Sequence, residues 1–423
     1  MLCMININSN IRLHYLPFEK LKTTVTGVYI HRPLNEEEAS YNALLPFVLK
    51  RGCVLCPNTE KISEYLEELY GASLYASVPK NGEDQAIYLE AEVINDRYSP
   101  ENEPLMSKTA DLLLSVIFDP VLEDGAFRRD FVEQEKKIAI ERIEAVKNDK
   151  RQYASTRCKE EMCEGEPFAV SGFGTVEGIS AITPESLYAY YKKIIISSVI
   201  DIFVCGEGDT ESIAKRIKLK TEGMSFTEAQ LPHMEISKPK AEVKKIVEKM
   251  DVAQGKMAIG FKTNIAADSE EYPALRVMNS IFGAGAHSKL FNNVREKLSL
   301  AYYASSMLVR YKGLLIVNSG IEFKNFEKAY DEILVQLENI KNGDISDEEF
   351  NSSVSAIINS IEEAKDDQRA LQKNCVAREI MGLEADLEAD KKAILQVTKE
   401  DAARAAQKLT LDTVYFLTGK EEA

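Results

Sequence analysis

Residues 273–303 read PALRVMNSIFGAGAHSKLFNNVREKLSLAYY, and no other segment indicates the fold as specifically. Apolar side chains recur at helical spacing up to Gly283, and the closely spaced Gly283 and Gly285 predict a turn. After the turn, a short helix carries Arg295, and a strand that contains Tyr302 ends the segment. The segment therefore predicts a helix, a turn, a short helix and a strand, as in a domain that combines helices with a sheet.

The two halves of the chain repeat the same pattern. Tyr41 and Tyr272 each open an apolar helix that follows a strand. Thr183 and Thr398 each predict a capped helix before a strand that ends in glycine. Strands joined both by hairpins and across helices predict an α+β fold. We expect two duplicated α/β sandwich domains, each a mainly antiparallel sheet covered by helices.

A polar, proline-bearing connector at 222–240 separates the two halves. We place an N-terminal domain at residues 1–230 and a C-terminal domain at residues 231–423. A chain of 423 residues is long enough for two or three domains of ordinary size.

The composition argues against several classes of partner. The 52 basic and 68 acidic residues give a net charge of −16, which disfavours nucleic acid and anionic membranes. No apolar stretch approaches the roughly 18 residues of a spanning helix, and no signal peptide is visible. Seven cysteines, an odd number, indicate free thiols, so we expect a cytoplasmic protein. Cys53 and Cys56 have the spacing of a metal or redox motif but lack the further ligands that such a site needs.

Histidine is scarce, which restricts metal chemistry. The chain has four histidines, His14, His31, His233 and His287, and no two are close in sequence. A helical His-x-x-Glu-His or His-Glu-x-x-His zinc site is therefore excluded by counting. His14 and His31 lie on predicted strands with no partner in sequence, and we do not expect His287 to be a ligand.

The segment at 273–303 resembles peptidase family M16, the group of pitrilysin, insulin-degrading enzyme and mitochondrial processing peptidase. In that family, a glycine-rich turn and Ser-x-Leu-Phe lead to an Arg-Glu-Lys helix and a strand that begins Leu-Ala-Tyr. The family's Arg and Tyr pair falls on Arg295 and Tyr302. The resemblance implies that these two residues are catalytic and donate hydrogen bonds to the scissile carbonyl or its oxyanion.

The resemblance covers nearly the whole chain but fails at the zinc helix. Counting back from Gly52 places the family's His-x-x-Glu-His on Ala43, Pro46 and Phe47, so two ligands and the general base are missing. Glu133 matches the third ligand of the family, and one carboxylate cannot hold a catalytic zinc. We therefore expect a degenerate zinc domain, with no metal and no cofactor in this chain and zinc only in a partner subunit.

One strand of the first half is a candidate substrate-binding edge. The family binds peptides by adding a strand to a sheet edge beside the zinc helix. The matching edge consists of Leu74, Tyr75, Ala76 and Ser77, followed by Val78. Main-chain pairing needs no particular side chains, so this edge is predicted to bind a peptide substrate. The alternative is an ordinary half-buried strand.

Two functional hypotheses fit these features. The first is a subunit, inactive alone, that supplies Arg295 and Tyr302 to a zinc-bearing M16 paralogue for peptide hydrolysis, as a heterodimer; a homodimer is the other assembly. Within the family, the chain is most similar to a bacterial two-domain branch named as inactive metalloproteases and associated with elongation factor P modification. The alternative is a non-enzymatic scaffold or peptide-binding protein. A chain active by itself would need zinc ligands from outside the family motif.

Overall fold

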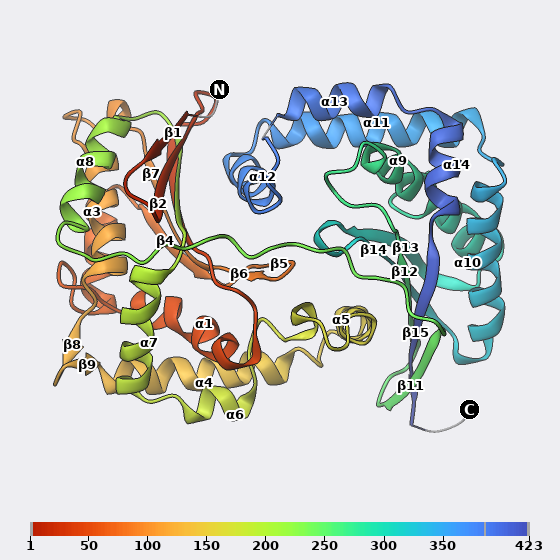
Figure 1. Cartoon of the computed structure of the whole chain (residues 1–423), viewed down its shortest axis with the longest axis horizontal. Helices are drawn as coiled ribbons and strands as arrows, with labels where there is room; N and C mark the ends of the chain where they lie inside the picture. The colour runs from red at the N-terminus through yellow and green to blue at the C-terminus, as the bar shows by residue number, and fades with distance from the viewer. Residues whose placement is uncertain (1–2, 385, 421–423) are drawn as a thin grey trace. The chain divides into compact units, whose positions relative to one another are not determined.

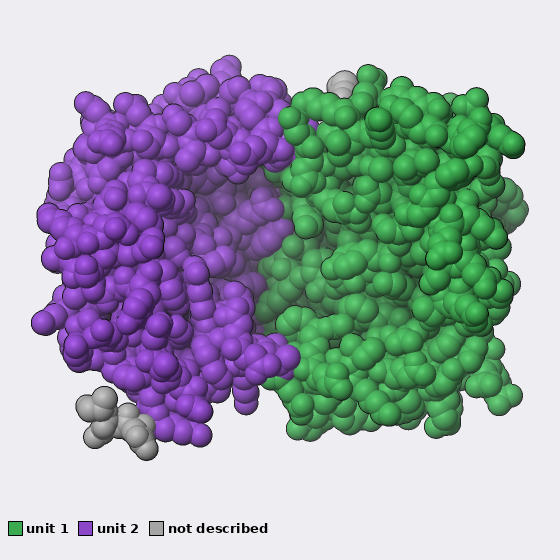
Figure 2. Space-filling view, turned by 180° about the vertical axis from the view of Figure 1, so that it is seen from behind, with its two compact units in different colours: residues 1–144, 170–233, 366–380 green, residues 145–169, 234–365, 381–423 purple. Residues whose placement is uncertain are grey.

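The computed structural model describes residues 3–384 and 386–420, which form two compact units (Figure 1; Figure 2). The first unit contains the described residues up to Glu144, Val170–His233 and Asp366–Ile380. The second unit contains Ala145–Ala169, Met234–Lys365 and the described residues from Met381 onward. Each unit therefore includes one segment from the opposite half of the sequence.

A six-stranded sheet forms the centre of the first unit. In spatial order its strands are β1 (Cys3–Asn6), β2 (Ile11–Pro17), β10 (Ile200–Gly206), β3 (Thr23–Ile30), β7 (Ile87–Ile94) and β4 (Ser73–Ser77). Neighbouring strands are antiparallel except β2 and β10, and β4 forms one edge. Two short pairs are β5 (Lys80–Asn81) with β6 (Asp84–Gln85), and β8 (Leu122–Glu123) with β9 (Ala126–Phe127).

Helices bury one face of this sheet in a large apolar core. Two of them, α1 (Glu36–Leu49) and α3 (Leu105–Phe118), lie against β7. The other helices of the first unit are α2 (Thr59–Glu68), α4 (Arg129–Ala145), α6 (Val176–Ala181), α7 (Pro184–Ser197), α8 (Thr210–Lys220) and α12 (Gln368–Ile380), the last of which contributes no residue to this core. Helix α12 comes from the second half of the sequence and contacts β10.

Alternation along the strands gives the first sheet two different faces. On β2, Ile11 and Leu13 join the apolar core, whereas Arg12 and His14 make polar contacts on the opposite face. Asp201 of β10 belongs to that polar face as well. The sheet therefore presents charged side chains on the face that does not pack into the apolar core.

The second unit contains a five-stranded sheet covered by helices (Figure 1). In spatial order its strands are β11 (Lys244–Met250), β15 (Thr410–Gly419), β12 (Gly255–Lys262), β14 (Leu314–Ile321) and β13 (Ala301–Val309). Only β11 and β15 pair in parallel. Its helices are α5 (Lys150–Met162), α9 (Tyr272–Phe282), the π-helix η3 (Leu290–Lys297), α10 (Phe326–Lys341), α11 (Asp347–Ala364), α13 (Leu387–Leu395) and α14 (Lys399–Gln407). Within residues 3–384 and 386–420, none of the helices has the length and apolar character needed to cross a bilayer.

A helix from the opposite half of the sequence packs closely on each sheet. Met162 of α5 lies over Gly260 of β12, where a Cβ atom would come within 2.1 Å of the Met162 sulfur. Gln372 of α12 lies over Gly27 of β3, where a Cβ atom would come within 1.8 Å of the Gln372 side-chain nitrogen. Glycine at these two positions therefore leaves room for the Met162 and Gln372 side chains, which a Cβ atom would displace.

The capped helices and the fold class predicted from the sequence are confirmed. Thr183 accepts a hydrogen bond from the Ser186 N–H, and Pro184 occupies the first turn of α7. Thr398 accepts one from the Asp401 N–H at the start of α14. Both threonines satisfy N–H groups that the first helical turn leaves unpaired. The two units have the α+β architecture expected for a duplicated chain.

Candidate functional site

Helix α1 carries the positions at which a zinc helix would present its ligands. Its cap is Asn35, which accepts a hydrogen bond from the Glu38 N–H at 2.8 Å. Proline is costly inside a helix, yet α1 continues through Pro46 because apolar residues on both sides of it are buried in the core. Ala43 is buried, Phe47 is half-buried one turn later, and neither has an atom that binds metal.

Glu133 and Glu135 of α4 form ion pairs with lysine and arginine. Glu133 is 48% exposed and lies 3.3 Å from the Lys136 ammonium. Glu135 Oε1 lies 2.6 Å from Arg51 Nε. In the described part of the chain, no three His, Cys, Asp or Glu side chains form a group suited to a metal ion. The residues present therefore do not fit a catalytic zinc.

A hollow of about 390 Å³, here called the β4 pocket, opens beside Ala43 and Phe47. Residues 75–79, which comprise the end of β4 and the two residues after it, form another wall. Arg142 of α4 and Phe173 complete the lining. The Arg142 guanidinium carbon lies 4.3 Å from the centre of the Phe47 ring. The β4 pocket therefore combines apolar and aromatic surface with a single positive charge, entirely within the first unit.

The predicted substrate-binding strand borders this pocket. Leu74 and Ala76 are buried, Tyr75 is 53% exposed, and Ser77 is half-buried. Antiparallel pairing joins β4 to β7 on one side only. Main-chain groups on its other side therefore have no strand partner in the described residues, which is the geometry that strand addition requires.

The expected short helix after the glycine turn is a π-helix. In η3, the Leu298 N–H donates to the Asn293 carbonyl at 3.1 Å, five residues back. The Leu300 N–H donates to the Val294 carbonyl at 3.0 Å, and Ser299 adopts a φ of 50°. Such helices are rare and are frequent at functional sites. A segment of eight residues is too short for side-chain periodicity to distinguish a π-helix from an α-helix.

Arg295 and Tyr302 are both accessible to solvent in the second unit. The Arg295 side chain on η3 is 41% exposed, and its guanidinium carbon lies 4.5 Å from the centre of the Phe291 ring. Its Nε also lies 3.4 Å from Glu296 Oε1. Tyr302 is 55% exposed on β13, which forms an edge of the second sheet. Neither a hydrogen bond nor an ion pair joins Arg295 to Tyr302 among the interactions of the described residues.

Comparisons with known proteins decide the family. Residues 181–357 match the family described as Peptidase M16 inactive domain. Over 412 residues, the chain is 38% identical to "Probable inactive metalloprotease YmfF" of Bacillus subtilis (strain 168), covering 97% of this chain and 96% of that protein. The chain belongs to peptidase family M16.

Solved structures agree with this assignment. A conserved protein from Enterococcus faecalis V583 superposes with a TM-score of 0.91 at 30% identity, covering 100% of this chain and 99% of that one. The peptidase M16 inactive domain from Pseudomonas fluorescens superposes with a TM-score of 0.79, covering 100% and 98%. Its 16% identity shows the fold alone. The resemblance predicted from the 273–303 segment is confirmed, and the chain is an M16 metalloprotease homologue without the family's zinc-binding pattern.

The sequence did not predict a buried polar cluster in the first unit of this M16 chain. We call it the Asp201 cluster; it comprises Arg12, His14, His31, Asp84 and Asp201. Arg12 donates to both Asp201 oxygens at 2.7 and 2.6 Å. The Nε2 atoms of His14 and His31 lie 2.8 and 3.2 Å from the Asp201 carboxylate. His31 Nδ1 lies 3.0 Å from Asp84 Oδ2.

Charges within the Asp201 cluster stabilise one another. Burial opposes protonation of His31, but Asp84 and Asp201 outweigh it and raise the pKa of His31 to about 10. Burial also opposes ionisation of Asp201, but hydrogen bonds from His14 and Arg12, together with the nearby positive charge of His31, hold the pKa of that carboxyl well below its usual range. An imidazolium and a carboxylate are therefore both buried in the folded state. An aspartate within the apolar strand at 199–206 was the one sequence signal for this cluster.

Stability should fall in mildly alkaline solution because of His31. The folded pKa of His31 exceeds its ordinary value of 6.5, so its contribution is fully present below pH 6.5 and is lost as the pH rises through about 10. Urea titrations between these pH values should show a falling free energy of unfolding. The variant His31→Gln, which cannot titrate, should have a flatter profile. Parallel profiles for the two proteins would contradict the assignment.

The described cysteines form no disulfide and belong to no cluster of possible metal ligands. Every cysteine is free, and all but Cys3 are buried. Burial and the neighbouring Cys53 thiol raise the pKa of Cys56 to about 11, so this thiol is protonated at neutral pH. The Cys53 N–H donates to the Cys56 carbonyl at 2.8 Å, so the motif forms a turn. His287 is also structural: its Nε2 lies 3.0 Å from Ser280 Oγ, and burial lowers its pKa.

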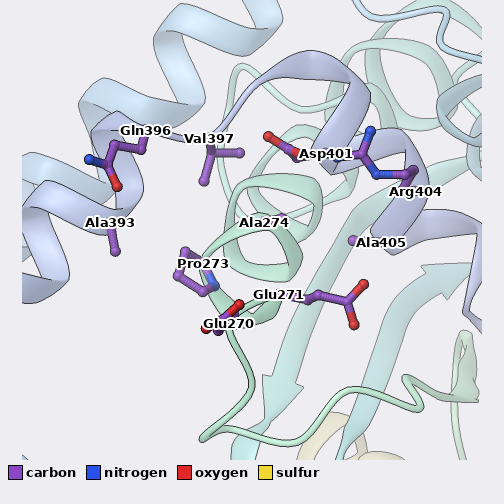
Figure 3. Close-up of a pocket in the computed structure, with 10 residues that line it drawn as sticks. All are labelled: Glu270, Glu271, Pro273, Ala274, Ala393, Gln396, Val397, Asp401, Arg404 and Ala405. Atoms are coloured by element: carbon purple, nitrogen blue, oxygen red, sulfur yellow. Dashed lines mark hydrogen bonds and ion pairs between the residues drawn. The ribbon is translucent and has the colours of Figure 1, made fainter.

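A second hollow, of about 230 Å³, lies in the second unit between α9, α13 and α14 (Figure 3). Two of its acidic side chains form ion pairs: Asp401 pairs with Arg404, and Glu271 pairs with Lys408. Figure 3 shows Asp401 and Arg404 side by side on α14, across from the start of α9. Because neither Arg295 nor Tyr302 lines this hollow, we assign it no part in the candidate site.

Proposed function

We propose that this chain is the non-zinc subunit of a two-chain M16 peptidase that hydrolyses peptides. A zinc-bearing paralogue would activate the water, and this chain would contribute Arg295 and Tyr302 as hydrogen-bond donors to the oxyanion. The observation that carries the proposal is a contrast: Ala43 and Phe47 replace the zinc ligands, whereas the guanidinium and the phenol are present and exposed. We place this complex in the cytoplasm, consistent with the unpaired thiols.

The division of the active site between two chains follows from the chemistry of peptide hydrolysis. The reaction needs an activated water and donors that stabilise the negative charge of the tetrahedral intermediate. This chain has no general base at Pro46, and its described residues include no cluster suited to a metal that would lower the pKa of water. A heterodimer would bring the two requirements together from different chains, whereas a homodimer of this chain would still lack the metal.

A second function, peptide binding without hydrolysis, is favoured by a different observation. The free edge of β4 and the adjoining β4 pocket need neither zinc nor Arg295. If a zinc-bearing paralogue gains no activity from this chain, peptide binding at β4 becomes the better proposal.

Purified protein should contain no stoichiometric zinc. Ala43 and Phe47 cannot coordinate metal, and Glu133 is paired with Lys136. Elemental analysis after overnight exposure to zinc and gel filtration should find far less than one zinc per chain. A zinc-bearing M16 peptidase treated identically is the positive control. One tightly bound zinc that is lost in Glu133→Gln would contradict the degenerate site.

A further inference from the structure

The β4 pocket contains a positive charge without a negative partner. Arg142 stacks on Phe47, and no carboxylate lies within ion-pair distance of its guanidinium in the described structure. The chain carries 68 acidic residues against 52 basic ones, and most arginines near the sheet of the first unit are paired, as Arg12 is with Asp201. An unpaired arginine at the wall of an apolar hollow favours an external carboxylate.

We infer that the β4 pocket binds the end of an extended peptide, with an apolar final side chain in the hollow and its terminal carboxylate on Arg142. Three features of the described residues point to this ligand: the free strand edge, the apolar walls and the unpaired guanidinium. The inference deepens the proposed function, since it names the peptide class that the first unit would hold.

The strand edge would recognise the main chain of the peptide. Residues in a β-strand present alternate N–H and C=O groups to each side, and β7 uses only one side of β4. An added strand would pair with the other side, next to residues 75–79 that line the pocket. The peptide would thus pass the hollow in an extended conformation.

Phe173 is held in place to receive an apolar side chain. It is 43% exposed, although the loop that carries it is fixed on both sides. The Gln85 side-chain amide donates to the Gly172 carbonyl at 2.8 Å, and the Thr175 N–H donates to Ser40 Oγ at 3.2 Å. An exposed aromatic ring on a fixed loop binds an apolar group with little loss of conformational entropy.

The Arg142 guanidinium supplies the positive charge that would bind the terminal carboxylate and so fix the direction in which the peptide lies. Arg142 forms no hydrogen bond or ion pair in the described structure, so its N–H donors can form two hydrogen bonds to a carboxylate. A volume of about 390 Å³ lies within the range of pockets that hold small ligands, and is ample for one aromatic or branched side chain.

Binding can be measured without a partner or zinc, so the test is independent of hydrolysis. The full chain would be equilibrated with short N-acetylated peptides of randomised sequence that end in phenylalanine, and retained peptides would be quantified by mass spectrometry. One pool would be free acids and a second pool amides. A third, amidated pool would have glutamate after the phenylalanine, so that a side chain supplies the carboxylate.

The free acids should be retained about tenfold more strongly than the amides, the scale of a charge-assisted hydrogen-bonded pair. Arg142→Gln should abolish this preference at unchanged melting temperature. Arg128→Gln should keep it, because Arg128 also stacks on a phenylalanine, Phe131, but does not line the pocket. Phe173→Ala should weaken binding of acids and amides alike.

If the glutamate pool is retained and Arg142→Gln abolishes that retention, Arg142 recognises a carboxylate, and the carboxylate can come from an acidic side chain. Equal retention of acids and amides by the unmodified chain, no retention of any pool at millimolar concentration, or a preference that survives Arg142→Gln would each overturn the inference. If a mixture with a zinc-bearing paralogue does not hydrolyse peptides although this chain still binds them, the result would contradict the proposed function and leave this inference standing.

Discussion

Arg295→Ala and Tyr302→Phe should each lower kcat of the reconstituted two-chain peptidase by about 10²-fold or more, the scale of losing one oxyanion donor. The reason is that each side chain donates where negative charge develops in the transition state, and water cannot replace a preorganised donor. KM should change much less, because the donor acts more strongly on the transition state than on the bound substrate. Steady-state kinetics on a fluorogenic peptide would measure both constants.

Two neighbouring substitutions serve as matched controls. Tyr303→Phe removes a hydroxyl from the next residue of β13, whose ring centre lies 4.2 Å from the guanidinium carbon of Arg151. Arg404→Ala removes an exposed arginine of the second unit that pairs with Asp401. Both should leave kcat nearly unchanged. If Arg295→Ala and Tyr302→Phe leave turnover unchanged, the result would contradict the catalytic role and favour the second function, peptide binding without hydrolysis.

Asp201→Asn should destabilise the first unit by about 3–5 kcal/mol, the usual cost of removing one partner from a buried charge pair. The asparagine has nearly the same shape, but it leaves His31 with only Asp84 and removes the carboxylate that accepts two hydrogen bonds from Arg12. Urea denaturation followed by circular dichroism would measure the change in the free energy of unfolding.

The exposed pair of Asp111 and Arg216 provides the comparison. Asp111 is 45% exposed, so Asp111→Asn should cost less than about 1 kcal/mol. Asp201→Asn should also reduce the loss of stability between pH 6.5 and 10, because Asp201 is one of the two carboxylates that raise the pKa of His31. A cost as small as that of Asp111→Asn would show that the Asp201 cluster contributes little to stability.

The sequence predicts much of the fold because the relevant signals are local. Thr183 and Thr398 cap their helices as expected, and the 273–303 segment forms the predicted helix, turn and strand. The missing zinc ligands are also local, since one turn of helix holds both Ala43 and Phe47. The interpretation of this half as degenerate therefore needed no tertiary information.

The remaining features depend on contacts between distant segments. His14 and His31 have no partner nearby in sequence, and only the order of β2, β10 and β3 in the sheet brings both to Asp201. Side-chain periodicity also cannot predict that α5 packs on the sheet of the second unit or that α12 packs on the sheet of the first. The β4 pocket arises in the same way, because Arg142 and Phe173 reach it from segments far from β4.

The most direct test of the central claim is to measure peptide hydrolysis by this chain, by a zinc-bearing M16 chain and by a mixture of the two. This chain would be assayed alone, with a His-x-x-Glu-His-bearing M16 chain from the same host, and with that mixture plus a zinc chelator. The account predicts no turnover by this chain alone and hydrolysis by the mixture that the chelator abolishes. Chelator-sensitive hydrolysis by this chain alone, or a paralogue equally active without it, would contradict the account.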